Sequence, residues 1–212
     1  DLLKFLSAVF SAMSGRLAKG APLYVFHASS TQAVFERALN NCGFKVRQQL
    51  IWNKGMILGR SHYHWAHEPI LYCCKENEKC RWFGQKDNKT VLGYGQDDLK
   101  ALSQDELLEL VLTLKRESTV WDIGRDAVIY YKHPTQKPVD LAIRAMSNSS
   151  KRGDVVLDSF LGSGSTLIAC EQAGRRCFGM ELDPLYCDVA LERYKEFTGD
   201  IPVSTEGRLF EE

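Results

Sequence analysis

Residues 155–166 read Val-Val-Leu-Asp-Ser-Phe-Leu-Gly-Ser-Gly-Ser-Thr, and this stretch decides the fold. An apolar run that ends in an acid and continues into two closely spaced glycines predicts a buried strand, a tight turn and the start of a helix. Glycine lets a backbone come close to a ligand, and the N–H groups of a helix N-terminus point outward toward it. The stretch therefore predicts a ligand site at the end of a strand.

A second strand is expected over residues 176–181, again with an acid, Glu181, at its carboxyl end. An acid in that position can accept hydrogen bonds from both hydroxyls of a ribose. A dinucleotide fingerprint needs glycine where Leu167 stands, and a P-loop needs a lysine soon after Gly164 that the chain lacks. A cofactor without a pyrophosphate fits better, and S-adenosylmethionine is the obvious candidate. The two adjacent β-turn-α units predict an α/β, doubly wound, mostly parallel sheet.

A third informative stretch is His-Pro-Thr-Gln-Lys-Pro at residues 133–138. Thr135 offers a hydroxyl, and Lys137 offers a cation suited to a carboxylate such as that of methionine. A simpler interpretation is a helix start, because proline at position 138 suits a first turn. Asp158 and Ser163 could likewise serve only as helix caps. Each simple interpretation is compatible with ligand binding.

At these residues the chain resembles the amino-methylating DNA methyltransferases, which methylate adenine N6 or cytosine N4. More narrowly it is similar to their permuted β group, in which target recognition precedes the cofactor motifs. Residues 158–166 resemble that family's motif I, usually D-P-F-x-G-S-G-S/T, with Ser159 in the place of proline. Residues 133–138 resemble motif X, residues 180–187 motif II, and residues 63–72 motif VIII.

The resemblance implies a Rossmann-like, class I methyltransferase fold with an inserted target-recognition region. It implies transfer of a methyl group from S-adenosylmethionine to the exocyclic amine of a flipped DNA base, adenine N6 rather than cytosine N4. The setting it implies is the cytoplasm of a bacterial or phage-infected cell, often with restriction–modification. The cofactor contacts implied by the motifs are His133, Thr135, Lys137, Asp158, Phe160, Gly162, Gly164, Thr166 and Glu181.

The family works through an Asp/Ser-Pro-Pro-aromatic tetrapeptide. Residues 183–186, Asp-Pro-Leu-Tyr, lack the second proline and are explained by Asp183 as a helix N-cap with Pro184 in the first turn. With no other candidate, the catalytic residues are unknown, and we expect the sequence to be a fragment. The missing part would include the strand beside the one that ends at Asp158, and its loss would leave apolar strand edges open. A second copy or a separate N-terminal fragment would complement it.

The middle of the chain changes character. We divide the sequence into a catalytic-side half at 1–75, a target-recognition insertion at 76–131, a cofactor half at 132–199 and a loose tail at 200–212. Basic residues interleaved with aromatics can contact phosphates and stack on bases. The residues expected to contact double-stranded DNA are Arg81, Trp82, Lys86 and Lys89. The alternative on these residues alone is a solvated surface insertion.

Periodicity predicts the remaining elements. A helix over Leu2–Leu17 would bury one apolar face that includes Leu2, Leu6 and Phe10. The other expected elements are a buried parallel strand at 23–27, a helix from 31 to 43, strands at 44–52 and 68–74 separated by a glycine-flanked loop at 55–60, a helix over 103–115, and helices beginning at 138 and 184.

Composition narrows the class. The formal net charge of the 212 residues is zero, so DNA contact must come from local patches. Seven cysteines without regular spacing suggest a reducing compartment rather than a disulfide framework. The sequence contains no run of about 20 apolar residues, so no membrane span is predicted. The histidines at 62, 64 and 67 with the cysteines at 73, 74 and 80 match no zinc spacing, so no metal is expected. Two alternatives remain: an RNA or protein methyltransferase, and an inactive prophage remnant that binds cofactor or DNA without turnover.

Overall fold

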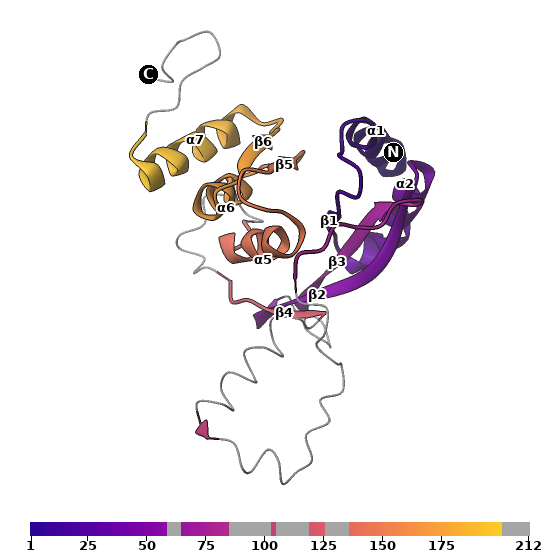
Figure 1. The fold of residues 1–212 in the computed structure, drawn as a ribbon, viewed down its shortest axis with the longest axis horizontal. Helices are drawn as coiled ribbons and strands as arrows, with labels where there is room; N and C mark the ends of the chain where they lie inside the picture. Colours follow the sequence, from indigo (N-terminus) through magenta and orange to yellow (C-terminus); the bar gives the residue numbers. More distant parts are fainter. Residues whose placement is uncertain (59–64, 85–102, 105–118, 126–135, 201–212) are drawn as a thin grey trace. The chain divides into compact units, whose positions relative to one another are not determined.

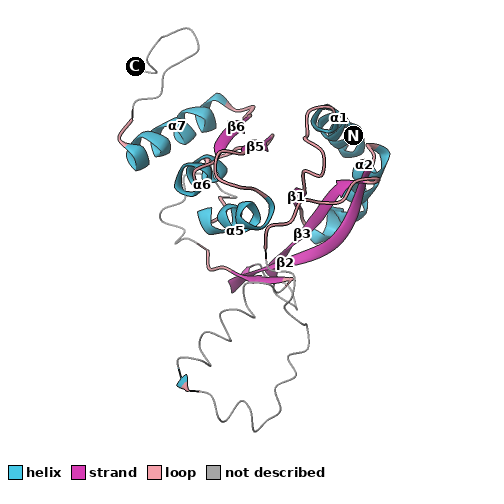
Figure 2. Ribbon diagram, in the orientation of Figure 1, coloured by secondary structure: helices cyan, strands magenta, loops and turns pink. Residues whose placement is uncertain are grey.

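The computed structural model describes residues 1–58, 65–84, 103–104, 119–125 and 136–200. Two compact units make up the chain, Asp1–Ile123 and Gly124–Glu212, and each is described by itself. Figure 1 labels their helices and strands, and Figure 2 colours them by type. No helix in the described part of the chain is both long enough and apolar enough to span a bilayer.

The first unit is built on a four-stranded sheet in the order β1-β3-β2-β4. Its strands are β1 (Leu23–Phe26), β2 (Phe44–Leu58), β3 (Trp65–Lys75) and β4 (Val120–Asp122). β3 runs antiparallel to β1 and β2, whereas β4 is parallel to β2. The prediction of a parallel strand at 23–27 was therefore wrong in its direction. A short apolar run specifies burial, but the direction depends on a distant partner strand.

β2 is longer than its apolar pattern indicates. The loop predicted at 55–60 was wrong as far as Leu58, because the strand continues through Gly55 to that residue. The pairing with β3 shifts register between Asn53 and Leu58, and Gly55 has a φ of +68°. The glycine thus marks an irregularity within a strand rather than its end. Gly59 and Arg60 lie outside the described residues.

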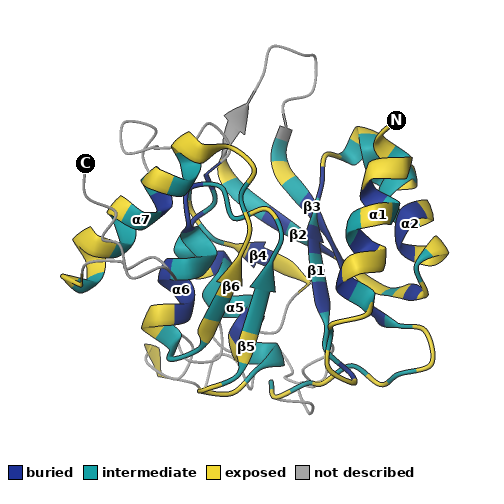
Figure 3. Ribbon diagram, turned by 90° about the horizontal axis from the view of Figure 1, so that it is seen from above, coloured by how far each residue is buried: buried dark blue, intermediate teal, exposed yellow. Residues whose placement is uncertain are grey.

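Helices α1 (Leu2–Ser14) and α2 (Gln32–Asn41) pack against each other, and α2 also packs against β2. A single 3-10 turn, η1 (Ser29–Thr31), precedes α2. α1 ends three residues before the predicted Leu17, and its Asp1 side chain caps the first turn. Its buried side chains are Leu6, Phe10 and Met13. Leu2, predicted to face inward, is 44% exposed. Figure 3 shows the burial of these elements, with the buried stretches of β1 and β3 in dark blue.

β4 was not predicted. It holds only three residues, too few for an alternating pattern to stand out. Trp121 at its centre is 3% exposed, and its ring centroid lies 5.8 Å from that of Tyr24. β4 therefore belongs to the core of the first unit. The assignment of 76–131 to target recognition stays a prediction, and the helix expected over 103–115 falls outside the described residues except for its first two.

The second unit follows the predicted alternation of helix and strand. Its elements are α5 (Val139–Ser149), β5 (Val155–Asp158), α6 (Ser165–Ala173), β6 (Arg176–Gly179) and α7 (Pro184–Thr198). β5 and β6 form a parallel pair with Val156 opposite Cys177. The apolar cluster beneath them consists of Met146, Ala169 and Cys170 with Val139, Ala142, Ile143, Val156 and Cys177 around it. The α/β prediction is confirmed, including the inward face of α5.

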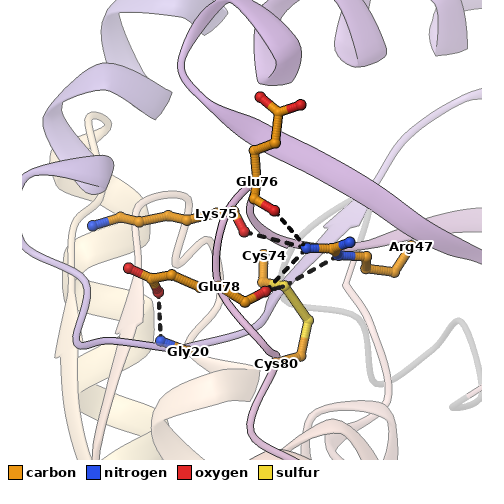
Figure 4. Close-up of a disulfide and its surroundings, with 7 residues drawn as sticks. All are labelled: Gly20, Arg47, Cys74, Lys75, Glu76, Glu78 and Cys80. Carbon is orange, nitrogen blue, oxygen red and sulfur yellow. Dashed lines mark hydrogen bonds between the residues drawn. A yellow bond between two sulfur atoms is a disulfide. The ribbon is translucent and has the colours of Figure 1, made fainter.

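A disulfide links Cys74 near the end of β3 to Cys80, a bond that the irregular spacing of the cysteines did not predict. After Lys75 the chain turns back and brings the two Cα atoms to 5.8 Å, a separation that a disulfide can bridge. Arg47 lies at a register shift of β2, and its guanidinium donates hydrogen bonds to the carbonyls of Lys75, Glu76 and Glu78. Figure 4 shows Arg47 beside the disulfide, with the Glu78 carboxylate accepting a bond from the N–H of Gly20.

Candidate cofactor site

The loop between β5 and α6 is shaped by its glycines, as predicted. Gly162 and Gly164 have φ angles of +55° and +81°, in the left-handed region that other residues avoid. Gly164 is the N-cap of α6, and no side chain of the described residues caps the helix there. A Cβ on Gly164 would lie 3.0 Å from the Cβ of Ala190 in α7. The loop therefore needs glycine at residue 164 both for its φ angle and for the close approach of α7.

Asp158 turns the chain out of β5. Its Oδ1 accepts the N–H of Phe160 at 2.9 Å, and its backbone carbonyl accepts the N–H of Met180 at 2.8 Å. The simple interpretation of Asp158 as a cap for α6 was therefore wrong, because its carboxylate binds within the loop. The Phe160 side chain is 55% exposed. Thr166 lies in the first turn of α6, partly buried.

Glu181 joins the glycine loop to the start of α7. Its Oε2 accepts the N–H of Gly162 at 2.7 Å, and its Oε1 accepts the N–H groups of Leu182 and Asp183 at 2.8 and 3.0 Å. Three backbone bonds hold the carboxylate in one orientation at the carboxyl end of the β5–β6 pair. The structure thus brings Asp158, Gly162 and Glu181 together in one loop cluster.

The hexapeptide 133–138 is only partly described, since His133 and Thr135 lie outside the described residues. The carbonyl of Lys137 accepts the hydroxyl of Ser165 at 2.7 Å. This bond places the end of the hexapeptide beside the first residue of α6. The predicted helix follows, beginning at Val139 with Pro138 as its N-cap rather than in its first turn. Gln136 is buried, with 7% of its side chain exposed.

The hydroxyl groups of Ser163 and Ser159 are both buried in the loop. The interpretation of Ser163 as a helix cap was wrong, because Gly164 is the N-cap of α6. Ser163 is 4% exposed, and its Oγ accepts a hydrogen bond of 2.9 Å from Nη1 of Arg193 in α7, which also binds its carbonyl. The hydroxyl of Ser159 is buried, and it has no hydrogen-bond partner within the described part of the chain. The sequence did not indicate the role of Arg193, because a single arginine on an amphipathic helix is usually a solvent-exposed side chain.

Asp183 has the capping role that the sequence predicted. Its Oδ1 accepts the N–H of Leu185 at 3.0 Å, and Pro184 occupies the first turn of α7. Tyr186 lies inside the helix. This geometry accounts for the tetrapeptide 183–186 by capping alone.

Arg81 and Trp82 lie in the first, N-terminal part of the predicted insertion. The N–H of Arg81 donates to the carbonyl of Gly20 at 2.7 Å, and the ring centroid of Trp82 lies 6.3 Å from that of Tyr72. Arg81 is exposed and Trp82 is partly buried, so this end of the stretch is anchored to the first unit. Lys86 and Lys89 lie outside the described residues.

One end of the first sheet gathers polar groups. Nζ of Lys54 lies 2.9 Å from Oε2 of Glu68, with the two side chains 15% and 19% exposed. The same Nζ lies 5.0 Å from the ring centroid of Trp52, whose Nε1 donates to the carbonyl of Ile123 at 2.7 Å. Glu68 therefore has a structural partner in Lys54.

Metal binding finds no support among the residues that the structure describes, where no cluster of three suitable ligands occurs. Cys74 and Cys80 form a disulfide, so their sulfur atoms are not thiolates that could bind a metal. Burial raises the pKa of the Cys73 thiol to about 12, and the charge of Glu36 acts in the same direction. A thiol held in that form is a poor metal ligand, because thiolate is the binding species.

The second unit therefore defines a Rossmann-like α/β protein with a glycine turn and an oriented acid at neighbouring strand ends, which suits a nucleoside. Comparison with known proteins names the family. The sequence model of the N6/N4 methyltransferases, described as DNA methylase, matches residues 1–192. The chain belongs to this DNA methylase family.

Individual relatives agree with this membership. The chain is 32% identical over 169 residues to the type II methyltransferase M.HinfI of Haemophilus influenzae, covering 74% of this chain and 42% of that protein. It is 24% identical over 190 residues to the DNA adenine methyltransferase YhdJ of Escherichia coli K12, covering 84% and 61%. A solved structure, the candidate DNA modification methylase TTHA0409 of Thermus thermophilus with S-adenosyl-L-methionine, is 26% identical with a TM-score of 0.61, covering 93% and 79%. The chain thus spans about half the length of these curated relatives.

Proposed function

We propose that the chain binds S-adenosylmethionine and belongs to an enzyme that transfers its methyl group to an exocyclic amine of a DNA base. Adenine N6 is the favoured acceptor over cytosine N4, and the base would be flipped out of the duplex. The observation that carries the proposal is the loop cluster of Asp158, Gly162 and Glu181 at adjacent strand ends. Family membership and the cofactor bound to the Thermus relative support it.

The cluster assigns a role to each group. Glu181 would accept the ribose hydroxyls, with its carboxylate already oriented by three backbone N–H groups. Phe160 and Asp158 would line the adenosine pocket, and Gly162, Gly164 and Thr166 would let the cofactor approach the start of α6. His133, Thr135 and Lys137 would face the methionine end, where the lysine cation suits a carboxylate.

The chemistry would depend on positioning and exclusion of water rather than on a strong base. S-adenosylmethionine supplies an activated methyl group when bound. The residues of this chain would hold it by its ribose and carboxylate so that the methyl group faces the amine. The family's Asp/Ser-Pro-Pro-aromatic tetrapeptide does not occur in the 212 residues. The groups of that tetrapeptide that hold the amine are therefore not assigned to residues of this chain.

Cofactor binding is tested by calorimetric titration with S-adenosylmethionine and with its 2′-deoxyribose analogue. We expect Glu181→Ala to weaken binding of S-adenosylmethionine about 10- to 100-fold, because a hydrogen bond to a charged acceptor is lost. The analogue lacks one hydroxyl, so the substitution should weaken it less. Glu192→Ala, which removes an exposed acid of α7, is the control with the same change in charge. Absence of binding by the folded chain would overturn the proposal.

DNA contact is tested at Arg81, which is the basic residue that the structure describes among the four residues expected to contact DNA. We expect Arg81→Ala to weaken binding to a duplex of mixed sequence and to reduce the slope of log affinity against log salt by about one. Lys4→Ala, at an exposed position of α1, should leave the slope unchanged. Equal effects of the two variants would contradict a specific role for Arg81. Labelled cofactor offered with DNA, RNA and protein substrates separates the proposal from the RNA and protein alternatives.

A further inference from the structure

The Cys74–Cys80 disulfide joins a buried residue to one that is partly exposed. Cys74 near the end of β3 is fully buried, whereas Cys80 keeps part of its surface open to solvent. The residues between them form the turn that follows β3, and Cys80 directly precedes Arg81. All of these residues belong to the first unit. A reagent in solution therefore reaches Cys80 more easily than Cys74.

Arg47 places a positive charge beside Cys74. Its Nε–H donates to Sγ of Cys74 at 3.4 Å. The same guanidinium donates to three carbonyls of the turn, those of Lys75, Glu76 and Glu78 (Figure 4). The carbonyl bonds hold the cation against the turn without the help of the sulfur. A fixed cation stabilises a thiolate relative to a thiol, so Cys74 is the sulfur of this pair that is better suited to leave as an anion.

We propose that the Cys74–Cys80 pair is a reversible redox modification site, opened by a dithiol and closed again by the corresponding disulfide. A thiolate of the dithiol attacks Sγ of Cys80, the S–S bond breaks, and its electron pair leaves with Sγ of Cys74 beside Arg47. The second thiol of the reagent then displaces Cys80 and completes the disulfide of the reagent. Two electrons and two protons pass from the dithiol to the protein, which ends with two thiols. The oxidised reagent drives the reverse reaction.

Opening the bond loosens the segment that carries a proposed DNA contact. Gly20 also restrains this segment, since its N–H donates to the carboxylate of Glu78 and its carbonyl accepts the N–H of Arg81 at 2.7 Å. The disulfide adds a covalent link from the same segment to β3. Without that link Arg81 is held by noncovalent bonds alone, so it loses more conformational freedom when it binds a phosphate. This consequence rests on the proposed contact between Arg81 and DNA, whereas the exchange chemistry does not.

The exchange is tested on the full chain in buffers that contain reduced and oxidised dithiothreitol. Acid quenching, alkylation and mass spectrometry should count five free thiols at the oxidising limit and seven at the reducing limit. The same midpoint should be reached from either direction. Reduced glutathione, a monothiol, should form its mixed disulfide at Cys80 and not at Cys74. A thiol count that does not change, or a mixed disulfide at Cys74, would overturn the proposal.

The role of Arg47 is tested by the rate of reduction. Arg47→Met removes the charge and should slow opening by dithiothreitol about three- to tenfold, because the Cys74 thiolate becomes a poorer leaving group. Arg47→Lys keeps the charge and should retain most of the rate. Arg37→Met, at an exposed position of α2, is the control and should not change the rate. If circular dichroism shows that Arg47→Met does not fold, Arg47→Gln takes its place. Reduction of the folded, uncharged variant as fast as that of the unaltered chain would overturn the role of Arg47.

The coupling to DNA is tested by titrating a duplex of mixed sequence with the oxidised and the reduced chain. The reduced chain should bind about three- to tenfold more weakly, because Arg81 has more freedom to lose. Cys80→Ser, which cannot form the bond, should bind like the reduced chain and should not respond to the dithiol. Equal affinities of the two redox states would overturn the coupling. Absence of binding in both states would refute the proposed DNA contact, whereas the thiol counts judge the redox site by themselves.

Discussion

The contributions of Ser159 and Ser163 to stability should have opposite signs, because their hydroxyl groups have different surroundings. Its hydroxyl is buried without a partner among the described residues, whereas the hydroxyl of nearby Ser163 accepts a hydrogen bond from Arg193. Removing an unpaired buried hydroxyl relieves a desolvation cost, so Ser159→Ala should raise the free energy of unfolding by about 1 kcal/mol. Ser163→Ala should lower it by about 1–2 kcal/mol, because it leaves the guanidinium of Arg193 with one acceptor fewer.

Urea denaturation of the two variants checks these opposite signs. A loss of stability in Ser159→Ala would mean that the hydroxyl has a partner in solution. The same variant titrated with S-adenosylmethionine shows whether that partner is the cofactor.

At the scale of elements, the junction of β5, α6 and α7 depends on Gly164. Its φ of +81° disfavours any side chain, and a Cβ would also lie 3.0 Å from Cβ of Ala190. Gly164→Ala should therefore cost about 2–4 kcal/mol, from the left-handed conformation and the overlap together. Gly199→Ala is the matched control, because Gly199 has a φ of +78° with open space around it, and it should cost only about 1 kcal/mol.

Chemical denaturation followed by circular dichroism measures both values. Equal losses would show that α7 moves aside easily. If α7 is rigid, Gly164→Ala should also weaken binding of S-adenosylmethionine, whereas Gly199→Ala should not.

The turn after β3 is a second element whose structure can be tested. With Cys74 and Cys80 bonded, five cysteines remain free: Cys42, Cys73, Cys170, Cys177 and Cys187. The denatured, unreduced chain should therefore titrate with a thiol reagent as five thiols, and as seven after treatment with a dithiol. In the native chain at pH 8, Cys73 should stay unreacted, since its pKa of about 12 keeps it as a thiol.

Seven thiols before reduction would show that the bond is not formed in the purified protein. Cys80→Ser removes the disulfide, and Arg47→Met removes the bonds to the carbonyls of Lys75, Glu76 and Glu78, so the two variants test each restraint on residues 75–80 by itself. Proteolytic cleavage within the turn should rise in both variants.

At the scale of the whole molecule, the two units should respond differently to ligands. S-adenosylmethionine at 100 times its dissociation constant should stabilise the protein by about 2.7 kcal/mol, if it binds only the folded state. Slowed amide hydrogen exchange should concentrate at Gly162, Leu182 and Asp183, which surround Glu181. The anchored amide of Arg81 in the first unit should be unaffected by cofactor and slowed by duplex DNA. Protection of Arg81 by cofactor alone would contradict a site confined to the second unit.

The second unit could be predicted from the sequence because its signals are local. Glycine spacing, an acid at a strand end and Asp183-Pro184 at a helix start each act over a few residues, so β5, α6, β6 and α7 were located to within about two residues. Family membership was likewise predictable, since motif residues act together in one loop. For the same reason the sequence could single out Asp158, Gly162 and Glu181 as cofactor candidates, and the structure places them in one loop cluster. Their role in cofactor binding stays a prediction.

The tertiary structure alone decided whatever depends on a partner distant in sequence. The antiparallel pairing of β1, the presence of β4, the continuation of β2 through Gly55 and the bond between Cys74 and Cys80 all depend on segments that meet only in the fold. The importance of Arg193 has the same origin. An arginine on an amphipathic helix is visible in the sequence, but its hydrogen bonds to Ser163 become apparent only in the fold, because hydrogen-bond satisfaction depends on the surroundings rather than on residue type.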